Sequence, residues 1–136
     1  MFRQTRVPTY EEFRAMYDED KDVFDNNVKR SGYEMLKDCF PLVCDNNDIE
    51  FVQWLIDKND KSKFPTLDDN IIFMMAVNNE FPILKLLYDT FKQYRSDEIT
   101  SIIAYNAKDH TDMSAWIQNK LTDKSIEMFD KMLLNK

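Results

Sequence analysis

The sequence has very few of the residues on which common catalytic and cofactor sites depend. Its 136 residues include one glycine, Gly32, and one histidine, His110. Phosphate-binding loops and dinucleotide-binding turns need several glycines, so both are excluded. A single histidine also excludes most zinc sites and mechanisms that use several histidines. We therefore expect no cofactor, no metal site and no enzymatic activity.

Cysteine is also scarce, with only Cys39 and Cys44. On one predicted helix this spacing turns the two side chains about 140° apart, so a disulfide between them is not expected. Two cysteines are too few for a secreted disulfide scaffold. This favours a reducing compartment, and we expect a cytoplasmic protein, in the host cytoplasm or nucleus if the chain is viral.

Long apolar runs and an excess of positive charge are missing as well. The longest apolar run, residues 71–77, is far shorter than the roughly 20 residues of a membrane span. Residues 1–6 lack the apolar core of a signal peptide. With 18 basic and 25 acidic residues the net charge is -7, which argues against nonspecific binding to nucleic acid or anionic lipid. A membrane partner is not expected, and nucleic acid is disfavoured.

The residues that are abundant indicate an all-α fold. Hydrophobic residues make up 43% of the chain, enough for a packed core. They recur at intervals of three and four almost throughout, which is typical of amphipathic helices. Capping residues such as Thr9, Ser96 and Thr122 mark helix starts. The predicted helices span 9–29 with a break near 18–22, then 33–44, 48–58, 67–77, 81–94, 97–106, 111–120 and 123–134.

Part of the chain repeats itself. Residues 42–56 align with residues 74–88 at a shift of 32 without a gap. Two adjacent asparagines and an acid occupy the same place in both copies, and two pairs of apolar residues follow. A weaker third copy begins at 102–106 and needs a two-residue insertion before 113–117. Each copy predicts a helical hairpin, which buries its apolar face by stacking on its neighbours.

The repeated hairpin resembles the ankyrin repeat, whose helices are joined by an Asn-Gly-His turn and whose second helix carries paired apolar residues. The 32-residue shift is close to the family's period of about 33. Asn47 and Asn79 stand where the family has its turn glycine, and asparagine also tolerates a positive φ. The family's Thr-Pro-Leu-His start and its hairpin between repeats are missing. A non-repeating helical bundle is the alternative.

The resemblance implies three sections within one compact domain. Residues 33–122 would form about three degenerate hairpins, and residues 1–32 an N-terminal cap or arm. Residues 123–136 would form a capping helix on the third hairpin. We expect the apolar side of that helix to contact Trp116, Ile117 and Leu121 through four residues: Ile126, Phe129, Met132 and Leu133.

Two sets of residues follow from the hairpin register. Partner-binding residues are expected next to the small residue that ends each first helix, namely Asp45, Val77 and Tyr105, together with Phe73. We also expect an adaptable groove along Met74 and Met75. The structural residues are Asn47 and Asn79, expected to have positive φ, and Cys44 and Ala76, expected to be buried where helices cross.

These expectations favour a non-enzymatic protein–protein interaction module. The abundance of asparagine, lysine and isoleucine is typical of AT-rich genomes, such as those of viruses and protists, and a viral chain would bind a host protein. One alternative is an acidic inhibitor that mimics nucleic acid, suggested by the acids of residues 18–25. Another is a Bcl-2-like helical inhibitor of host signalling or apoptosis, with residues 67–94 as its central hairpin. For His110, which lies among acids, a turn or capping role is expected rather than catalysis.

Overall fold

The computed structural model describes residues 7–135, so residues 1–6, whose sequence lacks the apolar core of a signal peptide, lie outside the described part. Within that part the protein is all-helical, with nine α-helices and no strand, and the predicted all-α class is confirmed. The chain divides into two compact units, Met1–Thr66 and Leu67–Lys136. Their boundary falls inside the predicted repeat section 33–122. Among the described residues, no helix combines the length and the apolarity needed to cross a bilayer.

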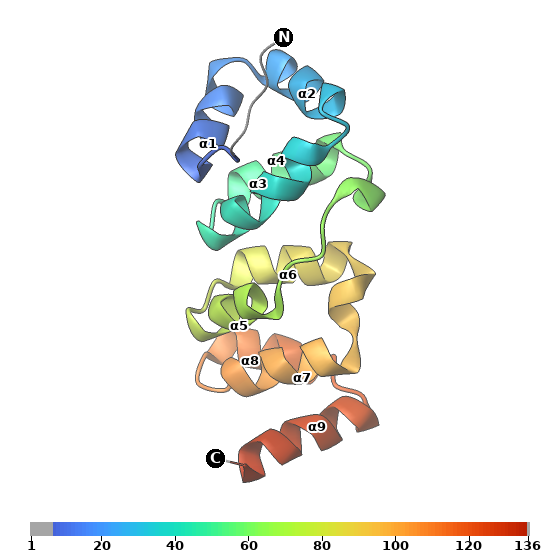
Figure 1. The fold of residues 1–136 in the computed structure, drawn as a ribbon. Helices are drawn as coiled ribbons and strands as arrows, with labels where there is room; N and C mark the ends of the chain where they lie inside the picture. Colours follow the sequence, from blue (N-terminus) through green and yellow to red (C-terminus); the bar gives the residue numbers. More distant parts are fainter. Residues whose placement is uncertain (1–6, 136) are drawn as a thin grey trace. The chain divides into compact units, whose positions relative to one another are not determined.

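Unit 1 contains four helices and a short 3₁₀ turn (Figure 1). Their bounds are α1 (Tyr10–Glu19), α2 (Lys21–Arg30), α3 (Glu34–Asp45), α4 (Ile49–Lys58) and η1 (Lys61–Lys63). The predicted helix 9–29 is broken at Asp20, inside the expected stretch. Asp20 is extended, and its carboxylate accepts hydrogen bonds from the N–H groups of Asp22 and Val23 at 3.0 and 3.1 Å. This residue therefore ends α1 and caps α2.

The core of unit 1 is built from aromatic rings. Phe13 of α1, Phe24 of α2 and Phe51 of α4 are fully buried, with ring centroids between 5.0 and 5.7 Å apart. Tyr17 and Trp54 extend the cluster, and their rings lie 5.0 Å apart. Such pairs add stability beyond the area that they bury. Phe51 and Trp54 belong to the first predicted repeat, and α1 and α2 cover them.

Unit 2 contains five helices and a second 3₁₀ turn (Figure 1). Their bounds are α5 (Asp69–Val77), α6 (Phe81–Thr90), η2 (Lys92–Arg95), α7 (Asp97–Asn106), α8 (Thr111–Gln118) and α9 (Asp123–Leu134). Helix α7 packs against both α5 and α9. The Trp116 ring on α8 lies 5.5 and 5.1 Å from the rings of Phe81 and Tyr88 on α6. The hairpins α5–α6 and α7–α8 therefore pack side by side, with α7 against α5 and α8 against α6.

The predicted helix 81–94 ends early, at Thr90. Phe91 is extended and buried, and the chain then forms η2. The hydroxyl of Tyr94, which is also buried, accepts a hydrogen bond from the N–H of Leu67 at 2.7 Å. A continuous helix would carry these two aromatic side chains to other positions, so their burial in unit 2 outweighs the local helical pattern.

The same turn closes the first two hairpins. Asn47 and Asn79 have φ of 53° and 58°, so the predicted positive φ is confirmed at both. In each turn the following N–H bonds to a carbonyl five residues back, from Asp48 to Val43 at 3.3 Å and from Glu80 to Met75 at 2.8 Å. Gly32 ends α2 with φ of 66° in the same way. These are Schellman turns, which satisfy the last carbonyls of a helix.

Asn79→Ala is expected to lower the free energy of unfolding of unit 2 by about 1 kcal/mol, because a Cβ in the left-handed conformation is strained. Asn79→Gly should be close to neutral, since glycine adopts this conformation freely. The control is Asn78→Ala, where φ is -86°. Denaturant unfolding followed by the fluorescence of Trp116 measures all three. Equal losses at positions 78 and 79 would show that turn strain is not the cause.

The prediction of which α9 residues are packed against the rest of unit 2 is partly wrong. Ile126 and Leu133 remain 42% and 39% exposed. The buried residue of the helix is Ser125, and Met128, three residues later on the same side, has its sulfur 4.0 Å from the hydroxyl of the buried Ser101 on α7. The Thr122 hydroxyl also donates to Asp97 at 2.6 Å, which joins the starts of the two helices. The helix is therefore rotated so that its serine side meets α7, and two of the four expected residues lie at the edge.

Candidate binding surface

The four predicted contact residues lie in two different units. Asp45 is the exposed last residue of α3 in unit 1. In unit 2, Val77 is the last residue of α5, Phe73 lies one turn before it, and Tyr105 is half-buried on α7. The structure thus places Phe73 and Val77 on the same side of one helix. Tyr105 lies on the helix that packs against α5.

Helix α5 is apolar on every side, although one side faces solvent. After Asp69 and Asn70 its remaining residues are all apolar. Three of them are buried, and three are exposed by about 40%: Phe73 (40%), Met74 (43%) and Val77 (38%). At 100° per residue these three fall within an arc of about 100° and form one surface, which we call the α5 row. A helix that is apolar all round is normally covered, so the α5 row is the strongest candidate for a binding surface.

Met74 completes the α5 row, whereas the other methionine of the predicted groove does not contribute. Met75 is buried in the core of unit 2. The two neighbours differ because successive helical residues point about 100° apart. The uninterrupted apolar run 71–77 was the signal for this surface in the sequence, since a helix covered on one side alone would carry polar residues on the other.

Residues of α7 and the following turn lie close to the end of α5. The ring of His110 places Nε2 2.8 Å from the Val77 carbonyl oxygen. His110 precedes α8 and makes no side-chain cap to it. His110 therefore lies in the turn before α8, as predicted, and also hydrogen-bonds to the preceding hairpin. The spacing of residues in the sequence did not predict this second contact. The Lys108 ammonium lies 4.3 Å from the centroid of the Tyr105 ring, a cation–π contact. The His110 contact joins the last turn of α5 to the turn that follows α7.

The small residues before the turns are buried, as predicted. Cys44, Ala76 and their equivalent in the third copy, Ala104, are all inaccessible to solvent. Burial raises the pKa of the Cys44 thiol well above its usual range and that of Cys39 to about 11. Both thiols are therefore protonated at neutral pH and unreactive. They pack as small apolar groups.

A polar cluster fixes α1 on the turn between α3 and α4. The Asp48 carboxylate caps α4 and accepts hydrogen bonds from the Tyr10 hydroxyl at 2.6 Å and from the Arg14 guanidinium. Arg14 also pairs with Asp18 and Glu50. Burial raises the pKa of Asp48. The hydrogen bonds from Tyr10, Arg14 and the backbone lower the pKa by more than burial raises it, so the net pKa is below the usual range. The cluster is fully engaged within unit 1 and has a structural role.

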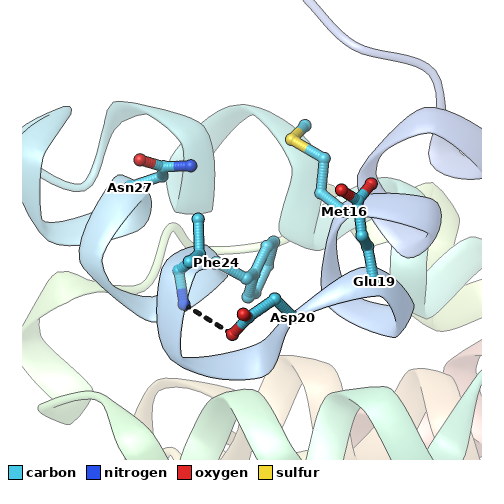
Figure 2. Close-up of a pocket in the computed structure, with 6 residues that line it drawn as sticks. Met16, Glu19, Asp20, Phe24 and Asn27 are labelled. Carbon is cyan, nitrogen blue, oxygen red and sulfur yellow. Dashed lines mark hydrogen bonds between the residues drawn. The ribbon is translucent and has the colours of Figure 1, made fainter.

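A small pocket of about 150 Å³ lies between α1 and α2 (Figure 2). Its lining is Met16, Glu19, Asp20, Val23, Phe24 and Asn27. Asp20 lies at the pocket because it is the N-cap of α2. Its carbonyl oxygen accepts a hydrogen bond from the N–H of Phe24 at 2.9 Å, drawn as the dashed line in Figure 2. The pocket carries acids at its edge but no basic or nucleophilic side chain. It is a weaker candidate than the α5 row.

The acidic stretch 18–25 is largely engaged in contacts inside unit 1. Asp18 pairs with Arg14 and Asp25 with Lys29, while Asp20 caps α2. Across residues 7–135, no three histidine, cysteine, aspartate or glutamate side chains gather in a way that could hold a metal ion. No protein family, curated protein or solved structure matches the chain. Its function must therefore be inferred from its own surface.

Proposed function

We propose that this chain is a non-enzymatic protein-binding module and that the α5 row contacts the partner. The supporting observation is that Phe73, Met74 and Val77 are adjacent, apolar and exposed on a helix with no polar side. Contiguous exposed apolar surface marks interaction sites in soluble proteins. Aromatic residues and methionine are enriched at the centres of protein interfaces, and Phe73 and Met74 are of these types.

The hairpin arrangement supports an ankyrin-like interpretation of the same surface. Asn47 and Asn79 close two hairpins with the same pair of hydrogen bonds. Within unit 2, α5–α6 and α7–α8 lie side by side, and α5 and α7 run in the same direction (Figure 1). Stacked hairpins present their first helices and turns as an extended binding surface. The α5 row lies on such a first helix, and a cellular protein, in the host if the chain is viral, is the proposed partner.

The two alternative functions have less support. For a nucleic-acid mimic, the acids of residues 18–25 would have to be free, whereas Asp18, Asp20 and Asp25 are engaged. For a Bcl-2-like bundle, the hairpin within 67–94 would be central and covered on all sides. The exposure of Phe73 and Met74 argues against that arrangement.

Met74→Glu is expected to abolish partner binding while leaving the fold intact, because a buried carboxylate at an apolar interface is costly and an exposed substitution changes stability by less than about 0.5 kcal/mol. The matched control is Val23→Glu on α2, an apolar residue with 54% exposure in unit 1. Proteins retained from cell extract by immobilised wild type and both variants are compared by quantitative mass spectrometry. Partners of the α5 row are lost with Met74→Glu and kept with Val23→Glu.

The same experiment separates the alternatives. An identical set of retained proteins on all three baits would contradict the proposed surface. Nucleic-acid-binding proteins that are retained regardless of Met74, and that elute between 50 and 200 mM salt, would instead indicate an acidic mimic, because that binding is electrostatic. An apolar interface at α5 should be nearly insensitive to salt over this range.

A further inference from the structure

The methionines of this chain differ in how far solvent can reach them. There are eight, and Met1 lies outside the described residues 7–135. Met74 is the one exposed methionine in the described part of the chain, with 43% of its surface accessible. The others are buried or half-buried, namely Met75 and Met113, and then Met16, Met35, Met128 and Met132. Among these seven, Met74 is therefore the thioether that a small dissolved molecule reaches most easily.

The two cysteines do not compete with Met74 for an oxidant. The reactivity of a cysteine towards oxidants follows its exposure and the fraction present as thiolate. Cys39 and Cys44 are inaccessible to solvent. Burial also raises the pKa of both thiols, so that both are protonated at neutral pH. The most oxidisable sulfur in residues 7–135 is therefore the one on the surface of α5.

Met74 lies within the proposed contact surface rather than at an isolated position. It shares the exposed side of α5 with Phe73 and Val77. A partner that covers the α5 row therefore also covers the Met74 side chain. Methionine suits such a surface because its thioether is apolar and its chain is flexible. Oxidation to the sulfoxide makes the same side chain polar.

We propose that Met74 is an oxidation site and that its sulfoxide abolishes binding at the α5 row. This rests on the proposed function, because the row must bind a partner for its oxidation to have this effect. The oxidant is a peroxide. The Met74 sulfur attacks one oxygen of hydrogen peroxide, an S–O bond forms as the O–O bond breaks, and the other oxygen leaves as water after proton transfer. The sulfur loses two electrons and the peroxide gains them.

The step is reversible, and it should leave the fold intact. A methionine sulfoxide reductase restores the thioether, while two thiols become a disulfide and the oxygen leaves as water. On the free protein the exposed sulfoxide of Met74 keeps its water. Beneath a partner it would lose that water without gaining a hydrogen bond, which disfavours the complex. A sulfoxide on the buried Met75 would instead disrupt the core of unit 2.

The first measurement needs no partner. The full chain is treated with hydrogen peroxide, and peptide mass spectrometry follows sulfoxide formation at each methionine. Met74 and Met75 share the tryptic peptide 64–85, so fragment ions are used to separate them. We expect Met74 to react at least about fivefold faster than Met75, with an unchanged circular dichroism spectrum. Equal rates at the two positions, or unfolding in step with oxidation of Met74, would overturn the proposal.

The second measurement tests binding. Wild type, Met74→Leu and Met16→Leu are immobilised, each with and without prior peroxide treatment, and the peroxide is removed before cell extract is added. The readout is retention of the proteins that Met74→Glu loses, compared between treated and untreated samples of the same variant. We expect a loss of at least about tenfold for wild type and Met16→Leu, and less than about twofold for Met74→Leu. Reductase treatment should restore binding to oxidised wild type.

The outcomes separate this proposal from the proposed function. If Met74→Glu retains the same proteins as wild type, the binding surface is wrong and the oxidation switch fails with it. If Met74→Glu loses proteins that peroxide-treated wild type still retains, the switch alone fails. An equal loss after treatment of wild type and Met74→Leu would place the sensitive group elsewhere and would also overturn the switch.

Discussion

Phe51→Ala is expected to lower the free energy of unfolding of unit 1 by about 3–5 kcal/mol, the usual cost of removing a buried phenylalanine ring. Phe51 is inaccessible to solvent, and its ring contacts those of Phe13, Tyr17 and Phe24 at 5.4, 4.4 and 5.7 Å. These partners come from α1 and α2, while Phe51 belongs to α4. The substitution therefore removes the ring that joins the N-terminal helices to the first predicted hairpin.

The measurement can assign the loss to one unit because each unit has a single tryptophan, Trp54 in unit 1 and Trp116 in unit 2. Denaturant unfolding is followed by the fluorescence of Trp54 in a Trp116→Phe background. Val23→Ala is the control, since Val23 is an apolar residue of unit 1 that is 54% exposed. If Phe51→Ala costs no more than Val23→Ala, the aromatic cluster is not the core of unit 1.

Ser101→Leu is expected to destabilise the contact between α7 and α9 by about 1–3 kcal/mol through overpacking. Ser101 is inaccessible to solvent, and its hydroxyl lies 4.0 Å from the Met128 sulfur of α9. A leucine at Ser101 has no space there without moving α9 outward. Hydrogen exchange of the α9 backbone amides measures this release directly, because locally opened helices exchange faster.

Ser101→Ala separates size from hydrogen bonding. The Ser101 hydroxyl donates to the Glu98 carbonyl at 2.7 Å, within its own helix, and makes a longer contact of 4.0 Å with the Met128 sulfur of α9. Loss of that bond should cost about 1 kcal/mol or less, and α9 should keep its protection from exchange. Equal effects of alanine and leucine would mean that close approach at Ser101 does not hold α9 in place.

The helix starts could be predicted from the sequence because capping is local. Thr9, Ser96 and Thr122 each accept a hydrogen bond from an N–H three residues later, so the signal and the structure lie within one turn. The end of α6 could not be predicted in this way. Phe91 and Tyr94 continue an apolar pattern, and only burial of both side chains within unit 2 requires the chain to leave the helix.

The candidate site was predictable in part. The hairpin register predicted Val77 as a contact residue, and Phe73 was predicted with it. The period of one helix puts both on the exposed side of α5. The contact of His110 with the Val77 carbonyl depends on how neighbouring hairpins pack, which no local pattern contains. The rotation of α9 was missed for a related reason. Two adjacent sides of that helix are apolar, and the side that carries Ser125 and Met128 meets α7.

The asparagine turns also bear on how quickly this protein can fold. Asn47 and Asn79 close their hairpins with hydrogen bonds between groups no more than five residues apart. Bringing such near groups together costs little chain entropy. Each hairpin can therefore form before distant segments meet, a topology associated with folding in roughly microseconds to milliseconds. Each hairpin keeps an open apolar face until it stacks on its neighbour, so the time before stacking sets how long that face is exposed to aggregation.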